Sequence, residues 1–330
     1  MKKPVVLGLT MGDANGIGPE IALKAACCAQ WPGRLRLVII GDRSVLRTAA
    51  RISKCRMPPE WSEIGRMPAE QVVFWAPEGI AMPHVCPGTI RVDASRAAVA
   101  WIEAAVDACG RCWLDGIVTG PVCKEGLYRA GAGVPGQTEL LGRLTGACRY
   151  AMMLVGGGLR ITLVTRHLPL AAVSRAVTAH SIITAVELTA AGLKRLGIRR
   201  GAIAVCGLNP HSGDGGAIGN EEKEVTIPAV RALKRRGFNV AGPIAADTVF
   251  YRARKGEFDA VVSMYHDQGL PVLKTLAFET GVNLTLGLPF PRTSPDHGTA
   301  FDIAGRGIAN PASMISAIKL AYELAQRGGK

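Results

Sequence analysis

Short apolar runs alternate along the chain with longer stretches whose apolar residues recur at helical spacing. The apolar runs predict strands, and the longer stretches predict helices. The predicted strands span 5–9, 37–40, 72–75, 116–118, 151–154, 160–164, 202–206, 260–263 and 283–285. The predicted helices span 19–28, 95–109, 138–145, 181–196, 221–236, 248–254 and 312–326. Strands that are apolar throughout, alternating with helices, are typical of a mostly parallel sheet covered by helices on both faces.

Length and composition indicate how many domains the chain can form and in which cellular compartment it lies. A chain of 330 residues, 48% of them hydrophobic and 20% charged, is long and apolar enough for two α/β domains or one large α/β unit. The nine cysteines are an odd number, and no secretory signal precedes them, which indicates reduced thiols. No stretch reaches the roughly 18 apolar residues of a membrane span. We therefore expect a cytoplasmic protein without a membrane partner.

The charge balance indicates the kind of ligand. The formal net charge is +13, but Lys and Arg are spread along the chain, with the densest clusters at Arg199–Arg200 and residues 234–236. No aromatic-rich basic stretch or zinc-finger spacing accompanies them, so we expect no nucleic-acid partner. Small anions that carry phosphate or carboxylate groups are the favoured ligands.

Two glycine motifs bear on nucleotide binding. The segment 11–20 reads MGDANGIGPE, between a predicted strand and a predicted helix. Its glycines allow a tight turn, Pro19 suits the first helical turn, and the free N–H groups there suit an anion. A GxGxxG match at Gly131, Gly133 and Gly136 follows a helical segment and not a strand. Any dinucleotide is therefore expected to bind without the usual Rossmann loop.

Three of the six histidines follow predicted strands directly. His167, His211 and His266 come after the strands 160–164, 202–206 and 260–263. A parallel sheet builds its site at the carboxyl ends of its strands, so these side chains are expected to share a site. Three neutral imidazoles with open positions suit a divalent metal that acts as a Lewis acid on a hydroxyl or carbonyl oxygen.

A further set of polar residues lies between residues 267 and 302. Lys274, Asn283 and Arg292 supply hydrogen-bond donors near one another in sequence. Arginine can grip a phosphate through two parallel hydrogen bonds, and lysine adds a point charge. The alternative interpretation is that these are solvated surface groups.

Four motifs together resemble one known family over essentially the whole chain. GDxxGIGPE, LNPHxGxGGxxGxEE, YHDQGLPVLK and DHGTAFDIAG resemble the 4-hydroxythreonine-4-phosphate dehydrogenase family of vitamin B6 biosynthesis. GIGPE and HGTAxDIAGxGIANP also resemble isopropylmalate and isocitrate dehydrogenases. The resemblance implies a two-domain α/β fold of the isocitrate/isopropylmalate dehydrogenase type. We expect one domain from residues 1–120 with 270–330, a second from 121–269, and an active site in the cleft between them.

The resemblance also implies a site shared by the two subunits of a homodimer. One divalent metal, with zinc, cobalt and magnesium as candidates, would bind His167, His211 and His266, one of them from the partner subunit. The implied substrate-binding residues are Gln137, Thr138, Lys274, Asn283 and Arg292. The implied catalytic residues are Lys274, Asp247 and Asp267. NAD, or alternatively NADP, would lie along His297, Gly298, Gly215 and Gly219.

The implied reaction is NAD-dependent oxidation of 4-phosphohydroxy-L-threonine at C3. Loss of carbon dioxide from the resulting β-keto acid gives 3-amino-2-oxopropyl phosphate, on the way to pyridoxal phosphate. One departure matters, because Gln137 stands in a GQTE segment where the family usually has GHTE. Gln137 can donate a hydrogen bond but cannot carry charge.

Other substrates and functions therefore stay open. Within the family they are 4-phospho-D-threonate, 4-phospho-erythronate and a dihydrodiol dicarboxylate, of which the retained Lys274, Asn283 and Arg292 favour the phosphorylated compounds. The more remote alternatives are a phosphate acyltransferase, which needs no metal, and a binding protein without turnover.

Overall fold

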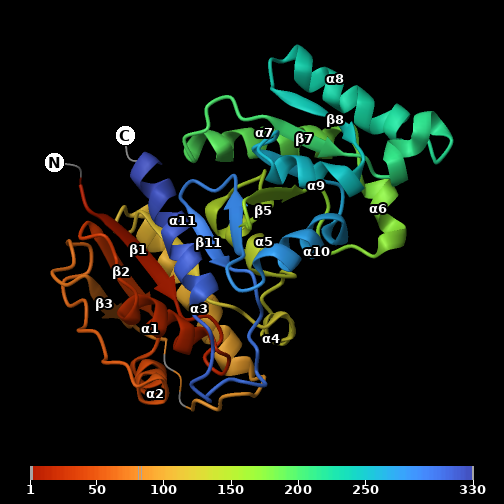
Figure 1. Ribbon diagram of the computed structural model, residues 1–330. Helices are drawn as coiled ribbons and strands as arrows, with labels where there is room; N and C mark the ends of the chain where they lie inside the picture. Colours follow the sequence, from red (N-terminus) through yellow and green to blue (C-terminus); the bar gives the residue numbers. More distant parts are fainter. Residues whose placement is uncertain (1–2, 81, 83, 329–330) are drawn as a thin grey trace. The chain divides into compact units, whose positions relative to one another are not determined.

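The computed structural model describes residues 3–80, 82 and 84–328, and the chain divides into two units (Figure 1). The first unit comprises Met1–Cys148 and Leu288–Lys330, and the second comprises Arg149–Gly287. These bounds differ from the expected boundaries after residues 120 and 269. Helices α4 (Lys124–Arg129) and α5 (Gln137–Thr145) pack on α3 (Val92–Gly110) of the first unit. Helix α10 (His266–Ala277) packs on strands β5 (Ala151–Gly156), β6 (Leu159–Leu163) and β9 (Ala260–Ser263) of the second unit. These segments lie with the sheets that their apolar faces cover.

The first unit is built on a parallel sheet. Its strands, in spatial order, are β3 (Val72–Trp75), β2 (Leu35–Ile40), β1 (Val5–Thr10), β4 (Gly116–Thr119) and β11 (Arg292–Pro295). Every neighbouring pair is parallel, with Val5 opposite Leu35 and Leu7 opposite Gly116. All six residues of β1 are buried, as expected for a strand with helices on both faces.

Six α-helices accompany this sheet in the described residues. They are α1 (Gly18–Cys28), α2 (Arg43–Ser53), α3 (Val92–Gly110), α4 (Lys124–Arg129), α5 (Gln137–Thr145) and α11 (Ala312–Gly328). Helix α3 packs on β1 and β4 through a face that includes the fully buried Trp101. Asp42 caps α2 by accepting hydrogen bonds from the backbone N–H groups of Ser44 and Val45.

The second unit has a mixed sheet. Its strands, in spatial order, are β10 (Val282–Leu286), β5 (Ala151–Gly156), β6 (Leu159–Leu163), β9 (Ala260–Ser263), β7 (Ile203–Cys206) and β8 (Val240–Ile244). The pairs β10–β5 and β5–β6 are antiparallel, and the others are parallel. Its helices are α6 (Leu170–Ala176), α7 (Ala179–Arg195), α8 (Ile227–Arg235), α9 (Ala246–Arg254) and α10 (His266–Ala277), with short 3-10 and π-helical turns at Pro210–Gly216 and Glu222–Thr226.

Side chains along the strands of the second unit point alternately to the two faces of the sheet, and each face forms its own hydrophobic core. Ile203 and Val205 of β7 join a cluster with α7 and α8, whereas Ala204 and Cys206 join a cluster with α9 and α10. Successive side chains of a strand point to opposite faces, so each face is covered by its own helices. The predicted α/β class, a mostly parallel sheet flanked by helices, is confirmed.

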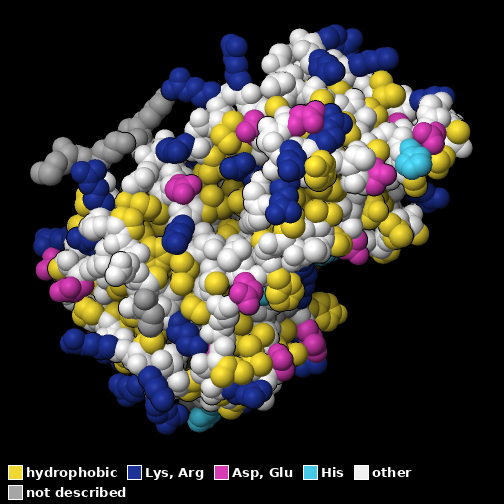
Figure 2. Space-filling view, in the orientation of Figure 1, with side chains coloured by type: hydrophobic (Ala, Val, Ile, Leu, Met, Phe, Trp, Pro, Cys, Tyr) yellow, Lys and Arg dark blue, Asp and Glu magenta, His cyan; other side chains and the backbone are white. Residues whose placement is uncertain are grey.

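Surface charges of the second unit include one shared acidic group. Glu187 on α7 forms ion pairs with both Arg149 and Arg236, and its side chain is 17% exposed. Hydrogen bonding to Arg149, with a smaller contribution from Arg236, lowers the pKa of Glu187 below its ordinary value. Figure 2 shows Lys and Arg side chains spread over the drawn face between hydrophobic and acidic ones, not gathered in one patch.

All nine predicted strands are present in the structure, but the sequence pattern missed strands β8 and β11 and helices α2, α4 and α6. Strand β11 reads Arg-Thr-Ser-Pro, a polar sequence, yet all four residues are buried. Helix α10 was also missed, because Pro271 lies inside it and its first residues are polar. Within the described residues, no single helix has both the length and the apolar composition to cross a bilayer, although α6 and α7, bent by 87°, pass that test as a pair.

Candidate active site

The turn after β1 is built around buried polar groups. Asp13 is fully buried and accepts hydrogen bonds from the Asn15 backbone N–H at 3.0 Å and from Ser95 Oγ at 3.2 Å. Burial raises the pKa of Asp13 above its ordinary value, against these hydrogen bonds. A Cβ on Gly18 would lie 2.0 Å from the carbonyl oxygen of Met11, so only glycine fits where the turn enters α1. The MGDANGIGPE segment is thus a fixed turn at the end of β1.

This turn contacts the HGTA segment of the same unit. The backbone N–H of Ile17 donates to the carbonyl oxygen of Thr299 at 2.9 Å, and a Cβ on Gly16 would approach that oxygen to 2.9 Å. His297 and Gly298 precede it; His297 Nδ1 lies 3.0 Å from the Gly298 carbonyl oxygen. His297 Nε2 is buried and has no hydrogen-bond partner among the described atoms. A buried orphan nitrogen beside a glycine-lined turn fits a polar ligand such as a dinucleotide.

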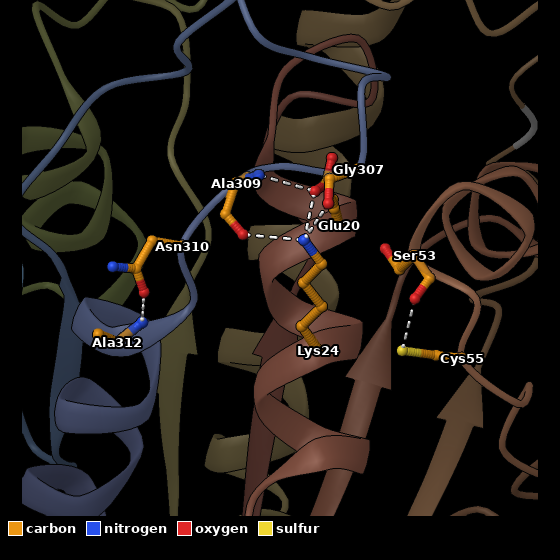
Figure 3. Close-up of polar contacts among 8 residues, drawn as sticks. All are labelled: Glu20, Lys24, Ser53, Cys55, Gly307, Ala309, Asn310 and Ala312. Carbon is orange, nitrogen blue, oxygen red and sulfur yellow. Dashed lines mark hydrogen bonds and ion pairs between the residues drawn. The ribbon is translucent and has the colours of Figure 1, made fainter.

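An ion pair on α1 holds the chain that follows the HGTA segment, at residues 307–309. Lys24 on α1 donates to Glu20 Oε1 at 2.7 Å and to the carbonyl oxygens of Gly307 and Ala309 at 2.8 and 2.9 Å (Figure 3). Glu20 Oε1 also accepts from the Ala309 backbone N–H at 2.9 Å. The two motifs that resemble isopropylmalate and isocitrate dehydrogenases are therefore held side by side. Glu20, the last residue of GIGPE, and Lys24 were not among the predicted site residues.

A buried arginine anchors the second cluster of the first unit. Arg292, at the start of β11, is 2% exposed. Its Nε and Nη2 donate to Thr119 Oγ1 at 3.1 and 2.7 Å, and Nη2 donates to Gln137 Oε1 at 2.7 Å. Burial lowers the pKa of Arg292 to about 10, and Glu139 opposes this shift. Arg292 therefore remains a cation at neutral pH.

Helix α5 brings two predicted substrate residues to this cluster. Gln137 and Thr138 are its first two residues, and Thr138 is buried. Gln137 Nε2 donates to the Gly120 carbonyl oxygen at 2.8 Å, just beyond β4. Sequence reasoning missed Thr119, which lies at the end of a short apolar strand and has no distinguishing motif.

Two predicted metal ligands lie together in the second unit. His167 follows β6 and His266 begins α10 after β9, and these strands are parallel neighbours with Leu163 opposite Ser263. The two imidazole centroids are 5.4 Å apart. His266 Nδ1 lies 2.5 Å from Asp267 Oδ1, which leaves Nε2 to face a ligand. This pair fits half of an imidazole metal site.

The third predicted ligand lies on a separate loop. His211 begins six successive residues with positive φ, at 50°, 56°, 81°, 41°, 63° and 99°. Its side chain is 64% exposed, and Nδ1 is 3.2 Å from Asp214 Oδ2. Gly215 and Gly219, predicted to bind cofactor, are exposed on this loop. Among residues 3–80, 82 and 84–328 no three His, Cys, Asp or Glu side chains are grouped to hold a metal.

A buried carboxylate holds the strained loop. Glu222 is 2% exposed, and its Oε1 accepts from the backbone N–H groups of Leu208 and Asn209 at 2.7 and 2.8 Å. Its Oε2 accepts from Asn209 Nδ2 at 2.9 Å. Left-handed conformations at non-glycine residues cost roughly 1 kcal/mol each and persist only where the surroundings enforce them. Glu222 supplies that constraint, and the EE pair in its motif was the available sequence indication.

The remaining predicted residues lie on three elements of the second unit. Lys274 is half-buried on α10, with its ammonium 5.8 Å from the Phe278 ring. Asn283 is half-buried on β10, and its buried Oδ1 has no hydrogen-bond partner among the described residues. Asp247 is exposed in the first turn of α9, and Asp267 is exposed beside His266. The orphan Asn283 oxygen fits a site that a ligand completes.

Comparison with known proteins gives full-length matches. A family model described as "Pyridoxal phosphate biosynthetic protein PdxA" matches residues 34–321. The chain is 42% identical to the D-threonate 4-phosphate dehydrogenase of Cupriavidus necator, covering 98% of each protein. It is also 42% identical to the 4-hydroxythreonine-4-phosphate dehydrogenase of Caulobacter vibrioides, again covering 98% of each. The crystal structure of 4-hydroxythreonine-4-phosphate dehydrogenase from Klebsiella pneumoniae superposes with a TM-score of 0.85 at 36% identity, covering 97% of this chain and 99% of that one.

Proposed function

Because the chain belongs to the PdxA family of pyridoxal phosphate biosynthetic proteins, we propose that it oxidises a small 4-phosphorylated hydroxy acid with a nicotinamide cofactor and a divalent metal. The observation that carries this proposal is the Arg292 cation, which is buried and surrounded by the hydroxyl and amide oxygens of Thr119 and Gln137. A guanidinium can bind a phosphate or a carboxylate through two parallel charged hydrogen bonds. The enzyme is a dehydrogenase by family.

The first substrate we propose is 4-phosphohydroxy-L-threonine. Oxidation at C3 removes a hydride from carbon and a proton from the hydroxyl, giving a β-keto acid. Loss of carbon dioxide then gives 3-amino-2-oxopropyl phosphate, a precursor of pyridoxal phosphate. Binding energy from the phosphate, which lies away from the reacting carbon, contributes to holding C3 in place.

Each predicted residue takes a role in this reaction. Arg292 and Lys274 neutralise the phosphate and carboxylate charges, since both are cations. Thr138, Asn283 and Gln137 orient the substrate through hydrogen bonds. The titratable groups that we expect to move protons to or from the substrate are Lys274, Asp247 and Asp267.

We further propose that His167 and His266 hold a divalent metal, with zinc, cobalt and magnesium as candidates. When bound, the metal withdraws electron density from the substrate oxygen as a Lewis acid. Asp267 orients His266 through Nδ1. His211 is the third imidazole of the proposed set, and one of the three ligands would come from a second copy of the chain. The active enzyme is then a cytoplasmic homodimer.

The cofactor is proposed to lie along His297 and Gly298, next to the turn that contains Gly16. NAD is the first choice and NADP the alternative. Gly215 and Gly219 are proposed to line the same cofactor from the His211 loop. The orphan Nε2 of His297 supports a polar ligand there.

A second candidate substrate is 4-phospho-D-threonate. One comparison favours it: the Cupriavidus relative with that substrate name is as similar to this chain as the 4-hydroxythreonine-4-phosphate dehydrogenase of Caulobacter. Gln137, in place of the histidine that the resemblance leads us to expect, leaves the choice of substrate open. The reaction chemistry is the same for both substrates, because each carries a hydroxyl at C3 between a carboxylate arm and a phosphorylated carbon.

The test is formation of the reduced nicotinamide with each substrate, with NAD or NADP, before and after chelation. Chelator-sensitive turnover of either substrate supports the proposal, and the larger kcat/KM identifies the physiological one. Arg292→Lys is the matched variant, because it keeps the charge but loses the forked geometry, and it should raise KM for both substrates. Metal-independent acyl transfer to phosphate, or binding without turnover, would contradict the proposal.

A further inference from the structure

The amide of Gln137 can adopt only one orientation. Its Oε1 faces Arg292 Nη2 at 2.7 Å, and its Nε2 faces the Gly120 carbonyl oxygen at 2.8 Å. A guanidinium only donates hydrogen bonds, and a carbonyl only accepts them. Turning the amide by half a rotation would set donor against donor and acceptor against acceptor. The two neighbours therefore determine which end of the side chain faces Arg292.

The same two neighbours define which side chains position 137 accepts. It needs an acceptor toward Arg292 and a donor toward Gly120. A neutral imidazole provides both, because one ring nitrogen accepts while the other donates. An imidazolium provides two donors and would place a positive charge against the guanidinium. Glutamine supplies the neutral pattern at every pH.

We propose that Gln137 is a positioning residue that fixes the Arg292 guanidinium with a neutral, non-titrating acceptor, so that anion binding by Arg292 does not depend on protonation at position 137. The proposal deepens the proposed function, since it rests on Arg292 binding the substrate phosphate or carboxylate. Besides Arg292 itself, the charged group acting on this cluster is Glu139, on the same helix as Gln137. A histidine at this position, the family's usual residue, would couple anion binding to pH.

The geometry explains why the effect should appear in KM. Arg292 is held by Thr119 on one side and by Gln137 on the other. Without the Gln137 acceptor, Arg292 Nη2 keeps its bond to Thr119 but loses its second acceptor, so the guanidinium is held less firmly in the orientation that binds the anion. Loss of one hydrogen bond to a charged group corresponds to about tenfold in affinity.

The test compares Gln137→His and Gln137→Leu with the wild-type enzyme between about pH 5.5 and 8.5, the range in which histidine titrates. Taking the ratio of variant KM to wild-type KM at each pH cancels the ionisation of the substrate phosphate. Q137L should raise KM about tenfold at every pH, with a smaller change in kcat. Q137H should match the wild type within about twofold at the alkaline end and lose affinity as its imidazole is protonated. Gln71→Leu, on a distant loop where Nε2 bonds the Trp31 and Pro32 carbonyls, is the control and should change neither parameter.

A second readout does not need turnover. In Q137H without substrate, the nitrogen NMR shifts of the new imidazole should give a pKa below the ordinary histidine value of about 6.5, because Arg292 opposes its protonation. If both candidate substrates are inert, affinity for inorganic phosphate is measured by calorimetry in the same variants. If neither substrate is turned over but the imidazole pKa in Q137H is lowered, the proposed function is refuted and the positioning role of Gln137 still holds. An imidazole that titrates normally, or a Q137L enzyme with wild-type KM at all pH values, would overturn the inference.

Discussion

Replacing Lys24 with methionine should destabilise the first unit by about 3 kcal/mol. The Lys24 ammonium uses all three of its donors, on Glu20 Oε1 and on the carbonyl oxygens of Gly307 and Ala309. The side chains of Lys24 and Glu20 are only 16% and 5% exposed. Methionine keeps the apolar length of lysine but leaves the Glu20 charge and two carbonyl oxygens without their cation.

The magnitude follows from this burial. Removing one partner of a buried ion pair costs about 3–5 kcal/mol, because the other charge stays buried without compensation. We expect the lower end of this range, because Lys24 is partly exposed and water can reach the Glu20 carboxylate once the ammonium is removed. Arg129→Met is the matched control, because Arg129 and Glu125 also pair at i,i+4 spacing but are 53% and 52% exposed. An exposed pair of this kind contributes about 0.5 kcal/mol.

Urea unfolding measures the free energy of unfolding of each variant. A double-mutant cycle of Lys24→Met, Glu20→Gln and the double variant isolates the interaction energy between Lys24 and Glu20. The double variant should be more stable than the sum of the single changes by about 1–2 kcal/mol, because it leaves no unpaired charge. Amide exchange at Ala309, whose N–H bonds to Glu20 Oε1 at 2.9 Å, reports on the segment directly and should accelerate in K24M. A cost for K24M no larger than that of the Arg129 control, with unchanged exchange at Ala309, would refute the reasoning.

Three further predictions concern a turn, a surface charge and the metal. Gly18→Ala should cost at least about 3 kcal/mol or prevent folding, whereas Gly33→Ala, where a Cβ would meet nothing within 4 Å, should be tolerated in the same thermal melts. Glu187→Gln should lower the free energy of unfolding by about 0.5–1 kcal/mol at neutral pH. The pKa of Glu187 in the folded protein lies below its ordinary 4.5, so the carboxylate stabilises the fold above pH 4.5. The difference in melting temperature between variant and wild type should therefore vanish as the pH falls through the lowered pKa. His266→Ala should weaken binding of added zinc at least about tenfold by calorimetry, whereas an equal loss in His180→Ala, an exposed histidine on α7, would point to nonspecific binding.

The sequence by itself determined the fold class and the pairing of two histidines. Apolar runs located β6 and β9, and residues that follow neighbouring parallel strands must emerge at the same edge of the sheet. His167 and His266 were placed together by this rule, and their rings lie 5.4 Å apart. The family membership was also readable, because the GIGPE and HGTA motifs are continuous in sequence.

Only the tertiary structure decided how the polar residues act. Strand β11 has no apolar period, so the burial of Arg292 depends on Thr119 and Gln137, which are distant in sequence. The direction of the Gln137 amide is likewise set by its neighbours and not by its own identity. His211 follows the same strand-end rule, but the sequence did not reveal that it begins a run of six positive-φ residues next to backbone held by Glu222. Periodicity predicts which face of an element is apolar, but hydrogen bonds between distant segments form only once the chain has folded, and a local pattern does not encode them.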